Sequence, residues 1–215
     1  MTDERISPVA LDGRPTETEE RDGWTVVLAY ADEGDGPHLT DLSHRTRWDV
    51  QASELSNVWA GAKPGGMAFP EAPGEARLEG GALAFRTTRT GAGIWYLAGP
   101  APEPPADPAV TDVSEGLLLL ALTGPRIFRI AERLTALDLE APDRKPPFAL
   151  LGPFSRVPCQ VAVIGRDGTD AGLLVACSRG YGADMVHALT DAGKSEGLRP
   201  AGERRFRDWL GRVSR

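Results

Sequence analysis

Histidine and cysteine, which often act in catalysis and as metal ligands, are scarce in this sequence. Its 215 residues include three histidines and two cysteines. Cys159 and Cys177 form no CxxC pair, so a zinc site built from thiolates is not expected. His38 and His44 lie around a predicted loop and His187 lies on a predicted helix, so no three-histidine metal site is predicted either.

His44 has the most polar sequence neighbourhood of these residues, because it follows Asp41 and Ser43. It is either a polar site residue or part of a solvated turn. The turn is favoured, because Asp and Ser side chains commonly hydrogen-bond nearby backbone. The two cysteines lie in predicted strands, where a free thiol behaves as a small hydrophobe, so we expect buried, reduced thiols.

Sequence motifs for cofactors are also missing. Gly91-Ala-Gly93 has no third glycine and lies between strands, so it is not a dinucleotide fingerprint. There is no P-loop, HExxH or nucleophile elbow. The residues therefore predict no catalytic group, and we expect the purified protein to be colourless and free of metal.

Charge and hydropathy narrow the class of protein. The formal net charge of −7 argues against a nucleic-acid binder, because phosphate contact needs clustered Lys and Arg. The longest apolar run, residues 117–122, is far shorter than the ~20 residues of a membrane-spanning helix. No apolar leader is visible in residues 1–22. Together these features predict a soluble cytoplasmic protein without membrane contact.

The hydrophobic patterns predict the strands and helices that would position these residues. Residues 1–22 are acidic and poor in apolar side chains, which predicts a flexible tail. Residues 24–30 and 45–51 are predicted strands, residues 54–62 a short helix, and residues 82–89 and 93–98 a hairpin. The proline-rich residues 99–109 predict a stiff connector.

The remainder of the chain repeats this order of elements. A strand is predicted over residues 116–123, followed by a helix that opens at Gly124-Pro125 and runs to Leu137. Residues 156–164 and 171–177 predict a hairpin. Ser178 is expected to cap a helix that ends at Gly193. Residues 204–213 are expected to form a last short helix or a turn.

A short internal repeat supports duplication. Leu39-Thr-Asp-Leu-Ser43 resembles Val110-Thr-Asp-Val-Ser114, 71 residues later. The sequence thus predicts an α+β fold of two duplicated strand–helix–strand–strand halves with antiparallel sheets. The expected organisation is a tail over residues 1–22, a first half over 23–98, the connector over 99–109 and a second half over 110–215.

Three segments resemble one protein family. Asp41-Leu-Ser-His44 is similar to the Asp-Val-Ser-His stretch near the start of aminomethyltransferases, and Gly197-Leu-Arg-Pro-Ala-Gly202 to their Gly-Leu-x-Pro-Cys-Gly stretch. The run from Asp112 through Gly124-Pro125 to Leu137-Asp-Leu139 resembles the gamma subunit of heterotetrameric sarcosine oxidase. The chain therefore resembles the folate-binding domain family of glycine-cleavage aminomethyltransferases, and that gamma subunit most of all.

Departures from the family pattern concern its acidic residues. Folate-dependent members carry Gly-Gly-x-x-Asp-Asp, whereas Gly80-Gly81 is followed here by Ala-Leu-Ala-Phe85. Asp170 matches the first glutamate of a second family motif, and Leu174 stands where its second glutamate would be. Arg207 fits the family's Arg-Asp-x-Leu stretch only with an insertion. If folate binds, the resemblance assigns Asp170 and Arg207 to it.

Two functions from different classes follow from the resemblance. One is a non-catalytic structural subunit of a flavin-dependent, sarcosine-oxidase-like amine-oxidising complex, with other protein subunits as partners and no cofactor in this chain. The alternative is a tetrahydrofolate-binding aminomethyl or methyl transferase of one-carbon metabolism. A stand-alone binding module or regulatory protein is a third hypothesis. Five residues are expected to form a partner surface: Trp59, Phe69, Trp95, Arg204 and Arg205.

Overall fold

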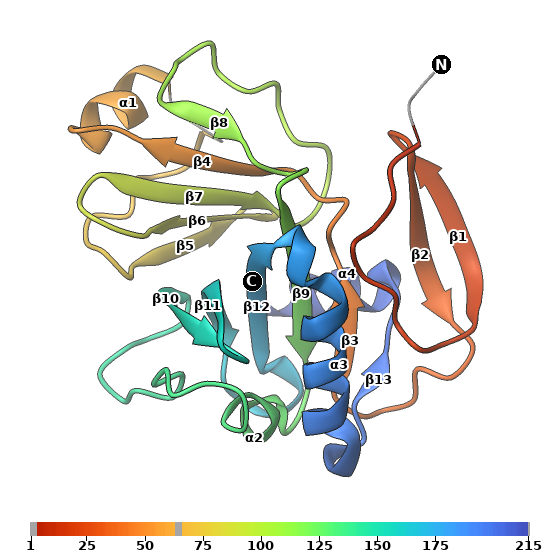
Figure 1. Ribbon diagram of the computed structural model, residues 1–215. Helices are drawn as coiled ribbons and strands as arrows, with labels where there is room; N and C mark the ends of the chain where they lie inside the picture. The colour runs from red at the N-terminus through yellow and green to blue at the C-terminus, as the bar shows by residue number, and fades with distance from the viewer. Residues whose placement is uncertain (1–3, 63–65, 215) are drawn as a thin grey trace.

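Two sheets with the same internal strand order form the body of the molecule (Figure 1). The computed structural model describes residues 4–62 and 66–214. The five-stranded sheet has the order β5-β6-β7-β4-β8 and the six-stranded sheet has the order β10-β11-β12-β9-β3-β13. All their strand pairs are antiparallel except β13 with β3.

The strands of the five-stranded sheet are β4 (Arg47–Gln51), β5 (Ala76–Glu79), β6 (Ala82–Arg86), β7 (Gly91–Tyr96) and β8 (Val110–Asp112). Those of the six-stranded sheet are β3 (His38–Asp41), β9 (Leu117–Thr123), β10 (Phe148–Phe154), β11 (Val157–Gly165), β12 (Gly172–Ser178) and β13 (Arg199–Pro200). The α-helices are α1 (Leu55–Ala62), α2 (Ile127–Ala131), α3 (Gly182–Gly193) and α4 (Glu203–Val213). Short 3₁₀ turns occupy Gly168–Asp170, Arg179–Tyr181 and Lys194–Glu196.

The order of elements confirms the duplication. In the first unit, β4 is followed by α1, the β5–β6 hairpin and β7. In the second unit, β9 is followed by α2, the β10–β11 hairpin and β12. In both sheets the hairpin, the last strand and the first strand of the unit lie side by side in the same order.

Each unit is completed by a strand that precedes the other unit in the chain. β3, just before the first unit, pairs with β9 of the second unit, and β8, just before the second unit, pairs with β4 of the first. Each sheet therefore contains one strand from the other predicted half of the chain, on the far side of residues 99–109. Local sequence patterns cannot show this exchange, because β3 and β8 are only four and three residues long and their partners lie far away in the sequence.

The internal repeat marks the two crossover turns. Asp41 accepts a hydrogen bond from the Ser43 amide at 2.8 Å, and Asp112 accepts one from the Ser114 amide at 2.9 Å. The Asp and Ser side chains thus fix turns, as the sequence predicted. The buried Arg47 guanidinium joins the two turns, because it donates to carbonyls on both sides of the crossover, among them those of Ser43 and Ser114.

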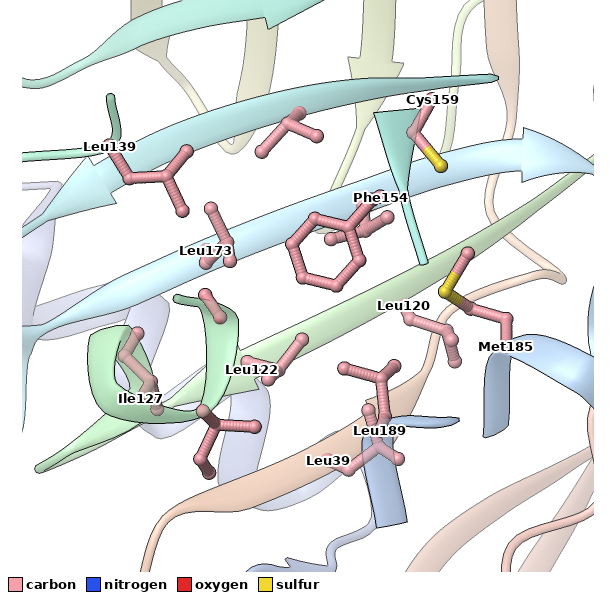
Figure 2. Close-up of a cluster of buried hydrophobic side chains, with 14 of the residues drawn as sticks. Leu39, Leu120, Leu122, Ile127, Leu139, Phe154, Cys159, Leu173, Met185 and Leu189 are labelled. Carbon is pink, nitrogen blue, oxygen red and sulfur yellow. The ribbon is translucent and has the colours of Figure 1, made fainter. Parts of the chain in front are cut away.

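The buried hydrophobic side chains form three clusters. Because successive residues of a strand point to opposite faces, β9 contributes to two of them. Leu118, Leu120 and Leu122 of β9 face α2 and α3, whereas Leu119 and Ala121 face α4 and the five-stranded sheet. In Figure 2, Leu120 and Leu122 lie beside Leu39 of β3 and Leu189 of α3. A third cluster lies between the five-stranded sheet and α1.

An N-terminal hairpin stands beside these sheets, at the right of Figure 1. It consists of β1 (Pro15–Arg21) and β2 (Trp24–Tyr30), joined by Asp22-Gly23. Both turn residues have positive φ, 51° and 84°, as a type I′ hairpin turn requires. The predicted flexible tail is therefore wrong for residues 15–21, which pair in this hairpin; its residues 1–3 lie outside the described part of the chain.

Two predicted helices differ in extent from the observed ones. α2 ends at Ala131 rather than reaching Leu137, and Leu134 is only partly buried against the core. Ser178 makes no cap hydrogen bond, and α3 starts at Gly182. The other helices and the main strands lie within a few residues of their predicted positions, and both cysteines are buried and free, as expected.

Candidate functional site

The turn after β3 places His44 and Arg45 inside the molecule. Asp41 fixes the backbone at Ser43, whose hydroxyl accepts from the Leu119 amide at 3.3 Å. This holds the turn against β9, so the chain that follows points inward. The His44 side chain is only 6% exposed. The expectation of a solvated turn at His44 is therefore wrong, because the side chain is buried. A buried imidazole normally has a polar partner.

That partner comes from the first turn of α4. Gly202 precedes the helix, and a Cβ there would lie 2.2 Å from the Leu28 backbone, so glycine permits the close approach of α4 to β2. The Gly202 amide donates to Glu33 at 2.9 Å. Glu203 follows as the first helical residue, and its side chain is fully buried.

Three cationic or polar side chains converge on one oxygen of Glu203. Arg21 Nη1 donates to Glu203 Oε1 at 3.0 Å, His44 Nε2 lies 3.1 Å from the same atom, and Arg45 Nη2 also donates to it. We call these four residues the Glu203 cluster. It ties the end of β1 and the turn after β3 to the start of α4, which are far apart in the sequence.

The cluster keeps Glu203 ionised. Burial by itself would raise the pKa of Glu203, but hydrogen bonds from His44 and Arg21 and the charge of Arg45 hold that pKa well below its usual range. A carboxylate with so low a pKa is a poor proton acceptor at neutral pH, because an effective general base has a pKa near the working pH. The geometry therefore makes Glu203 an anchor for cations rather than a base.

A cavity of about 560 Å³ adjoins the cluster, and we call it the arginine cavity. Three guanidinium groups line it, those of Arg21, Arg45 and Arg207, together with Asp22 and Tyr96. Residues 98–101, with mostly small or apolar side chains, form the rest of one wall. Its lining thus combines positive charge with an apolar surface.

Sequence comparisons found nothing: no family model matches the chain, and no curated protein matches it. Solved structures do match it. A chain of the heterotetrameric sarcosine oxidase from Corynebacterium sp. U-96, in complex with pyrrole 2-carboxylate, aligns with a TM-score of 0.60 and 17% identity over 77% of this chain and 87% of that one. Aminomethyltransferase T of the Bartonella henselae glycine cleavage system aligns with a TM-score of 0.56 and 15% identity over 89% of this chain.

The chain shares the fold of these two proteins. The predicted α+β class and its likeness to the aminomethyltransferase folate-binding domain are thereby confirmed at the level of the fold. The chain spans 57% of the length of the aminomethyltransferase. Most of the sarcosine oxidase chain, in contrast, has a counterpart here.

Within this aminomethyltransferase-like fold, the two predicted folate-binding residues lie at different places. Arg207 lines the arginine cavity. Asp170 is exposed in the 3₁₀ turn before β12 and forms an ion pair with Arg212 at 3.2 Å. The structure thus does not join Asp170 and Arg207 in one site.

The apolar departures from the folate-dependent pattern lie in the core. Gly80-Gly81 forms the β5–β6 turn, with φ of 57° and 79°, and Ala84 and Phe85 follow in β6 with no exposed surface. The Phe85 ring packs at 4.7 Å from the Trp95 ring, in the space between the two sheets. Leu174 of β12 belongs to the same cluster.

The expected partner-surface residues divide into buried and accessible ones. Trp59 and Trp95 are 5% and 1% exposed, so neither anchors a partner in this conformation, which corrects the prediction for both. Phe69 is partly buried against Trp59. Arg204 and Arg205 reach the surface of α4, where Arg204 pairs with Glu17 and Arg205 lies 3.1 Å from His38.

The described residues contain no cluster of three or more His, Cys, Asp or Glu that could hold a metal ion. Across residues 4–62 and 66–214, every helix falls short of the length and apolar character needed to cross a membrane. Sequence reasoning missed Glu203, Arg21 and Arg45. Two family-like segments do lead to the cluster in the sequence. His44 is the last residue of Asp41–His44, and Glu203 directly follows Gly197–Gly202.

Proposed function

We propose that this chain is a non-catalytic subunit of a cytoplasmic, sarcosine-oxidase-like amine-oxidising complex that also contains a flavoprotein chain. The fold supports this proposal, since it matches most of a chain of a heterotetrameric sarcosine oxidase. In this proposal the chain holds no cofactor of its own, and its partners are other protein subunits.

The observation that carries the proposal is the apolar filling around Phe85. Ala84, Phe85 and Leu174 stand where folate-dependent relatives are expected to have carboxylates, and all three are fully buried. Phe85 lies against Trp95 and across Gly93, where a Cβ would be 2.4 Å from the Phe85 ring. A pterin ring with several N–H donors would find no carboxylate at these positions.

The Glu203 cluster supports the same conclusion. The carboxylate of Glu203 is fully buried, and it interacts with Arg21, His44 and Arg45. Proton transfer to or from a substrate needs a positioned group with a pKa near neutrality. Glu203 has a strongly lowered pKa, which suits it to stabilise the fold rather than to exchange protons.

Two measurements test the proposal. Titration calorimetry of the isolated chain with tetrahydrofolate is expected to show no binding. Each pterin N–H donor that is buried without an acceptor would lower the binding free energy by about 1–3 kcal/mol. Affinity purification of the tagged chain from its native cells is expected to recover a flavoprotein, identified by its flavin absorbance and by mass spectrometry. Micromolar binding of tetrahydrofolate would instead support the aminomethyl or methyl transferase.

A surface variant sharpens the second measurement. Arg204→Glu reverses a charge on the exposed face of α4, one of the accessible partner-surface candidates, and is expected to reduce recovery of the flavoprotein. Arg129→Glu makes the same change on the exposed face of α2 and serves as the matched control. Equal recovery with both variants would place the contact away from α4, and the absence of any flavoprotein would contradict the proposed complex.

A further inference from the structure

The two cysteines lie opposite each other on neighbouring strands of the six-stranded sheet. β11 and β12 run antiparallel, with Gln160 opposite Ala176. The same register, continued by one residue along each strand, pairs Cys159 with Cys177. Both side chains belong to the buried cluster that faces α2 and α3, so the two thiols leave the sheet on the same face.

The hydrogen-bond pattern makes this the closer of the two kinds of antiparallel pair. The two-residue turn Ser155-Arg156 joins β10 to β11, and its φ angles are 50° and 67°. The residues that flank such a turn form a hydrogen-bonded pair, and hydrogen-bonded positions alternate along the strand. The backbone N–H and C=O of Cys159 therefore point toward Gly152 of β10 and away from β12. Cys159 and Cys177 are thus a non-hydrogen-bonded pair, for which the Cα atoms lie about 4.5 Å apart.

That separation suits a disulfide, because the Cα atoms of bridged cysteines are usually about 4.4–6.8 Å apart. Both residues are free thiols here, and they are only 5% and 3% exposed. A hydrogen bond from the Cys177 thiol lowers the pKa of Cys159 more than burial raises it. The same hydrogen bond, together with burial, raises the pKa of Cys177. Cys159 is therefore the thiol that reacts first, because the thiolate is the nucleophile.

We propose that Cys159 and Cys177 form a redox modification site, in which hydrogen peroxide converts the two thiols to a reversible cross-strand disulfide. The Cys159 sulfur attacks one peroxide oxygen and becomes a sulfenic acid, and the other oxygen leaves as water. The Cys177 sulfur then attacks the sulfenic sulfur and forms the S–S bond. The sulfenic hydroxyl leaves with the Cys177 proton as a second water. Each sulfur gives up one electron, and the peroxide takes up both.

The surroundings of the pair favour this product. In Figure 2 the Cys159 sulfur points into the apolar cluster that also contains Met185 of α3. A small oxidant reaches such a sulfur during brief local openings of the fold. The thiol of Cys177 is then the nearest nucleophile, so it captures the sulfenic acid before further oxidation. The site is independent of the proposed function, since it depends only on this chain.

Peptide mass spectrometry of the isolated protein tests the site. The protein is treated with hydrogen peroxide, the excess is removed with catalase, and the remaining thiols are blocked with N-ethylmaleimide in urea. Trypsin then cleaves after Arg156, Arg166 and Arg179, which leaves the two cysteines in separate peptides, 157–166 and 167–179. We expect these peptides to be linked, with a total mass lower by two hydrogen atoms, and dithiothreitol to separate them. Two blocked thiols, or a sulfinic acid without a link, would overturn the proposal.

Two variants show whether the bridge forms within one chain. Cys159→Ser and Cys177→Ser each keep one thiol, and circular dichroism checks that each variant folds. An equal mixture of the two, oxidised together, is expected to give no linked peptides. Linked peptides as abundant as those from the wild type would show a disulfide between chains and refute the cross-strand site. The wild-type measurement decides the question by itself if either variant does not fold.

Discussion

The Glu203 cluster makes a strong prediction about stability. Glu203→Gln keeps the size and one acceptor oxygen of the side chain but removes its charge. Arg45 then loses its carboxylate partner, whereas Arg21 keeps its ion pair with Glu19. The side chains of His44 and Arg45 are only 6% and 9% exposed. Removing one partner of a buried ion pair typically costs about 3–5 kcal/mol. We expect about 3 kcal/mol, because the remaining amide oxygen still accepts a hydrogen bond.

Urea denaturation measures this free energy of unfolding. The midpoint should fall while the denaturant slope stays the same, because the surface exposed on unfolding does not change. Glu17→Gln is the control, since it neutralises a carboxylate of an exposed pair with Arg204 and is expected to cost less than about 1 kcal/mol. A loss below about 1 kcal/mol for Glu203→Gln would refute the reasoning.

A second variant guards against failure of the single variant to fold. Glu203→Gln combined with Arg45→Gln removes both buried partners and leaves no uncompensated charge between them. The double variant should be less destabilised than the sum of the two single variants, with a coupling of about 0.5–3 kcal/mol. Strict additivity would mean that Glu203 and Arg45 do not stabilise each other.

The same cluster predicts a pH dependence. The pKa of Glu203 is lowered on folding, so its contribution is fully present above the unfolded pKa of about 4.3 and is lost as the pH falls toward the folded pKa. The difference in stability between the wild type and Glu203→Gln should therefore be constant from neutral pH to about pH 5 and shrink below about pH 4. A difference that grows on acidification would contradict the assigned direction.

Packing predictions can be tested with matched pairs. Leu120→Ala, at a fully buried position of β9 (Figure 2), should lower the free energy of unfolding by about 2–5 kcal/mol. Leu151→Ala, at a position 47% exposed, should lower it much less. Thermal denaturation compares the two variants, and equal losses would contradict the core assignment. Gly202→Ala places a Cβ 2.2 Å from the Leu28 backbone and should cost about 1–3 kcal/mol. Gly211→Ala, in the same helix with no atom within 4 Å of the added Cβ, should be neutral or stabilise by up to about 1 kcal/mol, so a gain for Gly202→Ala or a large loss for Gly211→Ala would refute this account.

Local sequence patterns predicted the strands and helices whose residues are mainly apolar or whose apolar residues recur at regular spacing. The predicted strand at residues 116–123 corresponds to β9, and residues 204–213, predicted as a short helix or a turn, form most of α4. The strand β1 was missed because its composition is acidic and its residues are mostly exposed. The Asp22-Gly23 dipeptide was the signal for a hairpin there, but its partner strand is stabilised by contact with α4, which no local pattern records.

The site was harder to predict than the fold. Arg21 and Glu203 are 182 residues apart in sequence and 3.0 Å apart in the structure, so neither residue type nor spacing indicates their pairing. Burial also reversed three expectations: Trp59 and Trp95 are core residues, and His44 is a buried member of the Glu203 cluster. The reason is the same in all three cases, because burial depends on which helices and sheet faces pack together.

The exchange of β3 and β8 affects how the chain can fold during synthesis. When the ribosome has released only residues up to about the connector, β4 has no neighbour on the side that β8 will occupy, and β3 has no β9 to pair with. Both exposed strand edges are sites for wrong pairing with other chains. Arg47 bonds carbonyls of both turns, so it finds its last acceptors, those of Ser114 and Leu117, only after the second unit begins to emerge. Co-translational folding therefore cannot complete the five-stranded sheet before β8 emerges, and β3 has no partner strand until β9 follows.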